Sequence, residues 1–143
     1  LQVRFLHRIL PVNNYLKRIN ILDCDLCTFC NKEAETLKHL FWDCEVTKTF
    51  LTALKTTLSN KWGNLVLNEV DFLFGSREQS VSLIFLYAKY FIFKCKTKGQ
   101  SPSLQFFTRY LKLEHETHEE IAIKRQNLET FNRTWAKVKI PIG

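Results

Sequence analysis

Three cysteines and one histidine within eighteen residues have the types and spacing best suited to chemistry. Cys27, Cys30, His39 and Cys44 form the pattern C-x2-C-x8-H-x4-C. Thiolates and imidazole are ligands that zinc prefers, and a short CxxC turn can present two sulfurs to one ion. Four protein ligands leave no open coordination position, so the pattern predicts one structural zinc ion, Zn(2+), per chain and no hydrolytic centre.

A fourth nearby cysteine leaves the register open. Cys24 and Cys27 also form a CxxC pair. We favour Cys27 with Cys30, because a ligand at Cys24 would lengthen the spacing to His39. Cys24 and Cys95 are then expected to be small core residues. The alternative to a metal site is that the four side chains meet by chance in a helical core.

The elements that position these ligands are predicted to be helices. The chain has 143 residues, four Gly and three Pro, which favours a single helical domain over a turn-rich sandwich. Apolar residues at helical spacing predict a helix over residues 33–58, directly after the cysteine turn. The expected fold class is mainly α: a small zinc-stapled helical bundle with a CxxC turn packed on a helix. Residues 1–60 would hold basic helices and the zinc module, and residues 61–143 a helical region packed on it.

The flanking segments add further predicted elements. A helix over residues 3–10 must end by Pro11, and a short helix capped by an asparagine should follow through Lys17. Residues 60–75 are expected to form a packed loop, with a short strand possible. Residues 81–96 are apolar on nearly every side and predict a central helix.

A narrow polar stripe interrupts that central helix. Ser82, Lys89 and Lys96 are spaced seven apart. After a polar break, Ser101 as N-cap with Pro102 starts another helix. Residues 104–135 contain neither Gly nor Pro, so one long bent helix or two stacked helices would fit. His115 and His118 lie among glutamates in this region, and we expect a solvated helix face there and no second metal site.

The charge distribution favours an anionic partner. Twenty-one Lys and Arg against fourteen Asp and Glu give a formal net charge of +7. Residues 1–22 and 79–113 contain no acid, whereas residues 113–120 hold four glutamates and no base. Hydrophobic residues at 45% and charged residues at 24% exclude a disordered tail, a collagen-like repeat or a mucin-like stalk.

The cysteine number and the length of the apolar runs indicate the cellular compartment. An odd number of cysteines, five, fits a reducing environment better than a disulfide framework. No apolar run reaches the roughly 20 residues that a membrane helix needs. We therefore expect a soluble intracellular protein with no membrane partner. The sequence has no Met, and we expect it to be a piece of a longer polypeptide.

Three blocks of the sequence resemble a known family. CTFCNKEAETLKHLFWDC resembles the zinc-binding segment that follows the polymerase in LINE-class non-LTR retrotransposon reverse transcriptases, where a CxxC turn precedes an ETxxHLFxxC helix. FLHRILPVNNYLKRINI is similar to the segment before that motif, and YAKYFIFKCKTKGQSPSLQFF is similar to the C-terminal portion of those polyproteins. The resemblance covers residues 5–113.

The resemblance implies a non-catalytic accessory module. Such a module would support the binding of template RNA or target DNA in target-primed reverse transcription, and its partners would be RNA or DNA and the remainder of the reverse transcriptase polypeptide. The parent protein would be an RNA-directed DNA polymerase with an endonuclease, found as a ribonucleoprotein in nucleus and cytoplasm. This chain lacks the Tyr-x-Asp-Asp context of the polymerase, so we expect no catalytic residues in it.

Two groups of basic residues are candidates for nucleic-acid contacts. Around the zinc motif they are Arg4, His7, Arg8, Lys17, Arg18, Lys32 and Lys38; in the central helix they are Lys89, Lys94, Lys96 and Lys98. Their alternative is a solvated basic face. Phe29 or Trp42 could stack on an unpaired base, with packing in the core as the alternative.

A second hypothesis comes from a different class. The zinc would staple a protein-interaction scaffold whose aromatic helices dock on the polymerase core or another protein. Salt separates the two hypotheses, because binding through several phosphates weakens steeply with salt whereas apolar docking barely changes.

Overall fold

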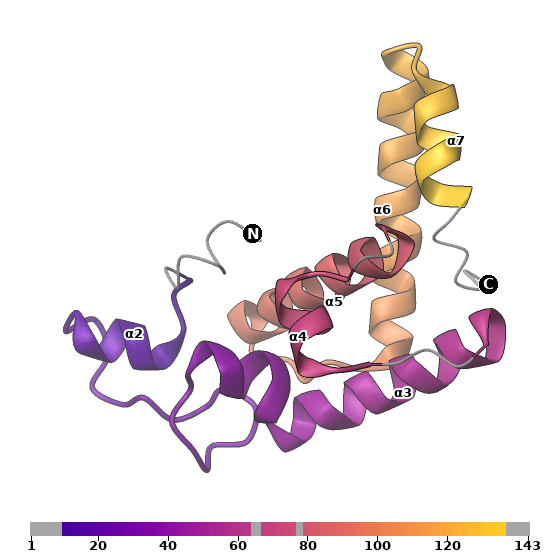
Figure 1. The fold of residues 1–143 in the computed structure, drawn as a ribbon. Coiled ribbons are helices and arrows are strands. Elements are labelled where there is room, and N and C mark those ends of the chain that lie inside the picture. Colours follow the sequence, from indigo (N-terminus) through magenta and orange to yellow (C-terminus); the bar gives the residue numbers. More distant parts are fainter. Residues whose placement is uncertain (1–9, 64–66, 77–78, 137–143) are drawn as a thin grey trace.

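The computed structural model describes residues 10–63, 67–76 and 79–136, and this part of the chain is helical (Figure 1). It contains no β-strand within those residues, only an isolated bridge between Leu26 and Ala34. The predicted mainly α class is confirmed. The helix predicted over residues 3–10 lies outside the described residues.

The described helices differ widely in length, and the last two form a hairpin. Their bounds are α2 Asn13–Arg18, the π-helical turn η1 His39–Asp43, α3 Glu45–Trp62, α4 Glu69–Phe74, α5 Gln79–Lys98, α6 Leu104–Lys124 and α7 Leu128–Ala136. In Figure 1, α3, α5 and α6 come together in the middle of the molecule, and α7 folds back along one end of α6. None of the described helices combines the length and the apolar character that crossing a bilayer requires.

Three phenylalanines form the junction of the central helices. The rings of Phe50 in α3, Phe91 in α5 and Phe107 in α6 lie 5.3 to 5.5 Å apart. All three are buried. Burying one such side chain stabilises a fold by roughly 1.5–3 kcal/mol, so this cluster fixes the three helices against each other.

The polar stripe of α5 faces other elements and not the solvent. Ser82 Oγ donates to the carbonyl of Ser76 at 2.6 Å, and Lys89 Nζ donates to the carbonyl of Leu73 at 3.1 Å. Lys96 Nζ lies 2.9 Å from the carboxylate of the buried Glu35. Residues seven apart share one face of a helix, and this face therefore holds the segments that precede α5.

Several predicted boundaries were wrong. The helix predicted over residues 33–58 begins only at Glu45, after η1 and a break at Cys44, where φ is −59° and ψ is 132°. The loop predicted over residues 60–75 contains α4, which is capped by Asn68: its side chain accepts from the backbone N–H of Asp71 at 2.8 Å.

The C-terminal region resolves into two helices. Ser103, and not Ser101, caps α6, because its hydroxyl accepts from the backbone N–H of Phe106 at 3.2 Å. α6 ends before Gln126, whose φ of 56° is left-handed and stops a helix. Of the two alternatives for residues 104–135, two stacked helices are correct.

Candidate metal centre

A tight turn brings the first two ligands to one side. The bridge between Leu26 and Ala34 closes the turn at its base, and the backbone N–H of Cys27 donates to Glu33 at 2.8 Å. Asn31, with φ of 54°, has the left-handed conformation that reverses the chain. The two cysteines of the CxxC sequence thereby present both sulfurs to the space beside η1.

The next two ligands depend on a π-helical turn. In a regular α-helix, residues five apart point about 140° away from each other, so His39 and Cys44 could not share an ion there. In η1 the backbone N–H of Cys44 donates to the carbonyl of His39 at 2.7 Å, five residues back. The wider turn and the extended conformation of Cys44 bring its sulfur back toward His39.

Two threonines stabilise this unusual turn. The hydroxyl of Thr36 accepts from the backbone N–H of His39 at 3.0 Å, which caps the turn at its start. The hydroxyl of Thr47 donates to the carbonyl of Leu40 at 2.6 Å. Thr47 is buried, and this bond pairs a carbonyl within the irregular turn.

The four ligand atoms have the spacing of a tetrahedral zinc site. All lie within 4.8 Å of one another, and theirs is the metal-suited group found among the described residues. The sulfurs of Cys27 and Cys44 are 3.8 Å apart, and the sulfur of Cys30 is 3.3 Å from His39 Nε2. Ligand bonds of about 2.3 Å to sulfur place neighbouring sulfurs of a tetrahedron roughly 3.8 Å apart. The residues fit zinc.

The environment of the thiols differs from one ligand to the next. Burial raises the pKa of Cys27 to about 12. Partial burial also acts to raise the pKa of Cys30, but the backbone N–H of Lys32 and the His39 ring outweigh it and lower that pKa to about 7. Cys30 is therefore the more readily ionised of these two thiols. Zinc binds thiolates, so Cys27 would lose its proton only when the zinc ion binds.

The second ring nitrogen of His39 is directed at a carboxylate. Nδ1 lies 3.4 Å from Glu33 Oε2 and forms no hydrogen bond with the described groups. Imidazoles that bind a metal through one nitrogen commonly donate the other N–H to a carboxylate, which fixes the ring orientation. Glu33 is placed for that role.

The sequence predictions missed a buried carboxylate that joins three parts of the fold. Glu35 accepts from the backbone N–H of Asn13 at 2.9 Å and of Thr28 at 2.6 Å. Its third partner is Lys96 Nζ of α5, at 2.9 Å. Burial acts to raise the pKa of Glu35, but these donors lower it overall. The available signal was its place in the ETxxH pattern, next to the capping Thr36.

Most of the basic residues around the metal centre are paired with acids. Lys17 lies 3.8 Å from Asp25, and Lys32 lies 2.8 Å from Glu45. Lys38 lies 3.8 Å from Asp43 and 3.5 Å from Glu69. These three lysines are exposed, and ion pairs between exposed side chains are weak.

Other predicted contacts are placed differently. Arg18 lies over the Tyr15 ring, with Cζ 5.8 Å from the centroid. Phe29 is half-buried and packs on the core, the alternative given for it from the sequence. Trp42 is half-buried too, and its ring centroid lies 5.7 Å from that of Phe72. Arg4, His7 and Arg8 lie outside the described residues.

The central-helix lysines separate into two groups. Lys89 is 3% exposed, so the prediction that it contacts nucleic acid was wrong: α4 covers it. Lys96 forms an ion pair with the buried Glu35. Lys94 and Lys98 lie near the end of α5, where Lys98 is exposed and Lys94 is half-buried.

The remaining cysteine and histidine predictions also have outcomes. Cys95 is buried as predicted, whereas Cys24 is exposed and is not a core residue. Cys24 lies outside the four-ligand group. His115 and His118 pack against Trp135, with ring centroids 5.0 and 5.6 Å from it, and are not part of a metal-suited group in the described chain.

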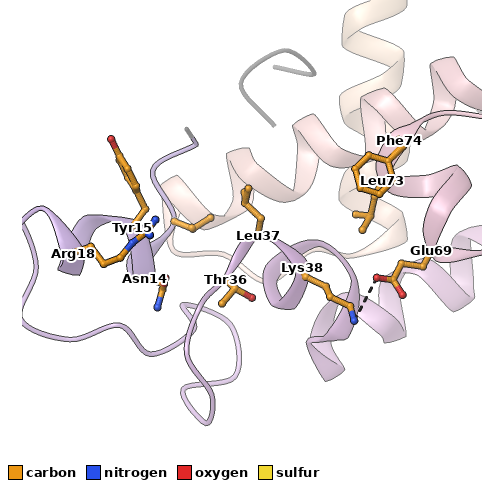
Figure 2. A pocket seen from close by; sticks show the side chains of 10 residues that line it. Asn14, Tyr15, Arg18, Thr36, Leu37, Lys38, Glu69, Leu73 and Phe74 are labelled. Carbon is orange, nitrogen blue, oxygen red and sulfur yellow. Dashed lines mark ion pairs between the residues drawn. The ribbon is translucent and has the colours of Figure 1, made fainter. Parts of the chain in front are cut away.

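A groove of about 490 Å³ lies beside the metal module (Figure 2). Tyr15 and Arg18 of α2 are at one end, and Leu73 and Phe74 of α4 are at the other. The ion pair between Lys38 and Glu69 lies among the lining side chains. The groove therefore has apolar walls with charges at defined points.

Comparison with known families bears on the segment that contains all four ligands. Residues 1–50 match the family model described as zinc-binding in reverse transcriptase. The match supports a reverse transcriptase zinc-binding region in this part of the chain. No curated protein and no solved structure matches the chain.

Proposed function

We propose that this chain is the non-catalytic, zinc-stabilised nucleic-acid-binding module of a LINE-class reverse transcriptase. It would bind template RNA or target DNA during target-primed reverse transcription, as part of a ribonucleoprotein in nucleus and cytoplasm. The observation that carries the proposal is the group of four ligand atoms within 4.8 Å of one another, inside a segment that matches the zinc-binding family of reverse transcriptases.

The protein residues give the metal a structural role. Cys27, Cys30, His39 and Cys44 would hold one zinc ion per chain, and zinc supplies a cross-link between the cysteine turn and η1 when bound. Four protein ligands leave no position for a substrate. Glu35 extends the same rigid unit to α2 and α5 through Asn13 and Lys96. The basic surface around the turn is thereby fixed in shape.

The charge of the chain supports a polyanion as its ligand. The formal net charge is +7, and a surplus of this kind attracts nucleic acid. The zinc module contributes Lys17, Arg18, Lys32 and Lys38, all of them exposed. Arg4, His7 and Arg8 are part of the proposal on the basis of the sequence.

A binding titration tests the proposal. The full chain, loaded with zinc, is titrated against labelled single-stranded and hairpin RNA between 50 and 200 mM salt. Binding through about six phosphates should weaken by orders of magnitude over this range. Replacing Arg4, Arg8, Lys17 and Arg18 together by Gln should weaken binding evenly across sequences and lower the log-log salt slope by about 0.7–0.9 per contact. Unchanged affinity and slope would contradict nucleic-acid binding by this segment.

A second candidate function is a docking scaffold for the rest of the reverse transcriptase polypeptide. The observation that favours it is the groove of Figure 2, whose lining includes Phe74 of α4, 59% exposed. Apolar docking in this groove would vary little with salt. Tight binding to a polymerase fragment that is insensitive to salt, with no binding to RNA or DNA, would favour the scaffold.

A further inference from the structure

A hollow with basic and aromatic walls lies where α5 ends and α6 begins, and none of the four metal ligands lines it. It has a volume of about 240 Å³. We call it the α5–α6 hollow, and its walls include Lys94, Lys98, Phe106, Arg109, Tyr110 and Leu113. Of the segment that matches the zinc-binding family, the described residues 10–50 do not line it.

The cations of the hollow lack acidic partners. Lys94, Lys98 and Arg109 take part in none of the ion pairs found within the described residues. The reason is in the sequence, because residues 79–113 contain no Asp or Glu. The nearest acid along α6, Glu114, lies 3.4 Å from His118. This differs from the zinc module, where Lys32 and Lys38 already face carboxylates.

Aromatic rings are interleaved with these cations. Lys94 Nζ lies 5.4 Å from the centroid of Tyr110, and Arg109 Cζ lies 5.9 Å from the centroid of Phe106. Phe106 is 46% exposed. Tyr90, also exposed, lies parallel to Tyr110 with an interplanar angle of 13°. A ring face next to an unpaired cation is the arrangement that binds stacked bases and their phosphates.

We propose that the α5–α6 hollow binds single-stranded nucleic acid, with phosphates on Lys94, Lys98 and Arg109 and a base stacked on Phe106. The inference rests on the proposed function and assigns it a second contact surface. A single strand fits better than a duplex, because bases inside a duplex present only their edges whereas the exposed ring of Phe106 needs a free base face. Charge complementarity selects a polyanion and not an apolar protein segment.

The test measures the affinity of the full zinc-loaded chain for a labelled 20-nucleotide oligouridine at several salt concentrations. The variant replaces Lys94, Lys98 and Arg109 by Gln. Its matched control replaces Lys48, Lys55 and Lys124 by Gln, which removes the same charge from other exposed positions. Three lost contacts should lower the salt slope by about 2 and the affinity at 0.1 M salt by roughly a hundredfold, with a much smaller effect in the control.

A second variant tests the stacking. Phe106→Leu keeps an apolar side chain but removes the ring, and it should weaken oligouridine binding by about tenfold while changing duplex binding little. Circular dichroism and the melting temperature should match the parent for all variants, since the side chains involved are exposed or half-buried.

The possible outcomes separate this inference from the proposed function. If the parent binds oligouridine and the hollow variant weakens no more than its control, the hollow is overturned while nucleic-acid binding stands. If the parent does not bind RNA or DNA at 50 mM salt, both are overturned and a protein partner becomes the better account. Selective loss in the hollow variant supports the inference.

Discussion

Replacing Glu35 by Gln should destabilise the chain far more than breaking an ion pair of the same length at the surface. The carboxylate of Glu35 is fully buried and receives the backbone N–H groups of Asn13 and Thr28 as well as Lys96 Nζ. An amide of similar shape has one acceptor oxygen and two donor hydrogens. At least one of these donors would then face another donor, and Lys96 would keep a charge without its counterion.

The magnitude follows from the burial of the pair. Removing one partner of a buried ion pair costs about 3–5 kcal/mol. For a chain of this size that corresponds to a fall in melting temperature of roughly 10–15 °C. The pair of Lys32 and Glu45 is the matched control, because its 2.8 Å separation is close to the 2.9 Å of Lys96 and Glu35. Its side chains are 69% and 62% exposed, against 10% and 0%, so Glu45→Gln should cost far less than Glu35→Gln.

Thermal and guanidinium unfolding of the zinc-loaded parent and both variants measure the difference. The dependence on pH gives a second readout. The pKa of Glu35 is below its usual 4.5 in the folded chain, so the folded state holds the ionised form more strongly. Its stabilising contribution is complete above pH 4.5 and is lost as the pH falls through the depressed pKa. Glu35→Gln should therefore lose less stability on acidification than the parent. Equal costs for Glu35→Gln and Glu45→Gln would refute the reasoning.

Two further predictions concern a cysteine and a lysine. Cys24→Ser should leave zinc affinity within a few-fold of the parent, because Cys24 is exposed and outside the ligand group, whereas Cys30→Ser should abolish tight binding. Competition with a chromophoric chelator measures both affinities. The reverse ranking would show that the wrong cysteines were assigned as ligands. Burial lowers the pKa of Lys89 to about 8, so the folded state binds fewer protons than the unfolded state between about pH 8 and 10.4, and stability should rise with pH in that window. Lys89→Met should remove the rise. Chemical unfolding at pH 7.5 and 9.5 that gives the same gain in stability for parent and variant would contradict a lowered pKa at Lys89.

The metal ligands could be predicted from the sequence because they are local and chemically distinctive. The CxxC pair, His39 and Cys44 needed only residue types and spacing, and the structure groups all four. The path between His39 and Cys44 could not be predicted in the same way. The apolar pattern continues at helical spacing through residues 37–58, so nothing in it indicated the π turn and the break at Cys44.

Contacts between distant segments account for the remaining differences. Lys89 was a candidate for nucleic-acid contact, but α4, where the sequence predicted a loop, covers it. Glu35 is buried against Lys96, a residue far along the chain, and no local sequence pattern indicates that contact. At the end of α5, the sequence predicted Lys94 and Lys98 as contacts from one helix alone. In the structure Arg109 and Phe106 of α6 line the same hollow.

The zinc content of the purified chain tests the central claim most directly. Native mass spectrometry of the full chain, prepared without chelator, should give one zinc ion per chain. Cys27→Ser, Cys30→Ser, His39→Ala and Cys44→Ser should each lose it, with a fall in helical circular dichroism because binding and folding are coupled. A metal-free parent whose spectrum and melting temperature do not change on adding zinc would contradict the account.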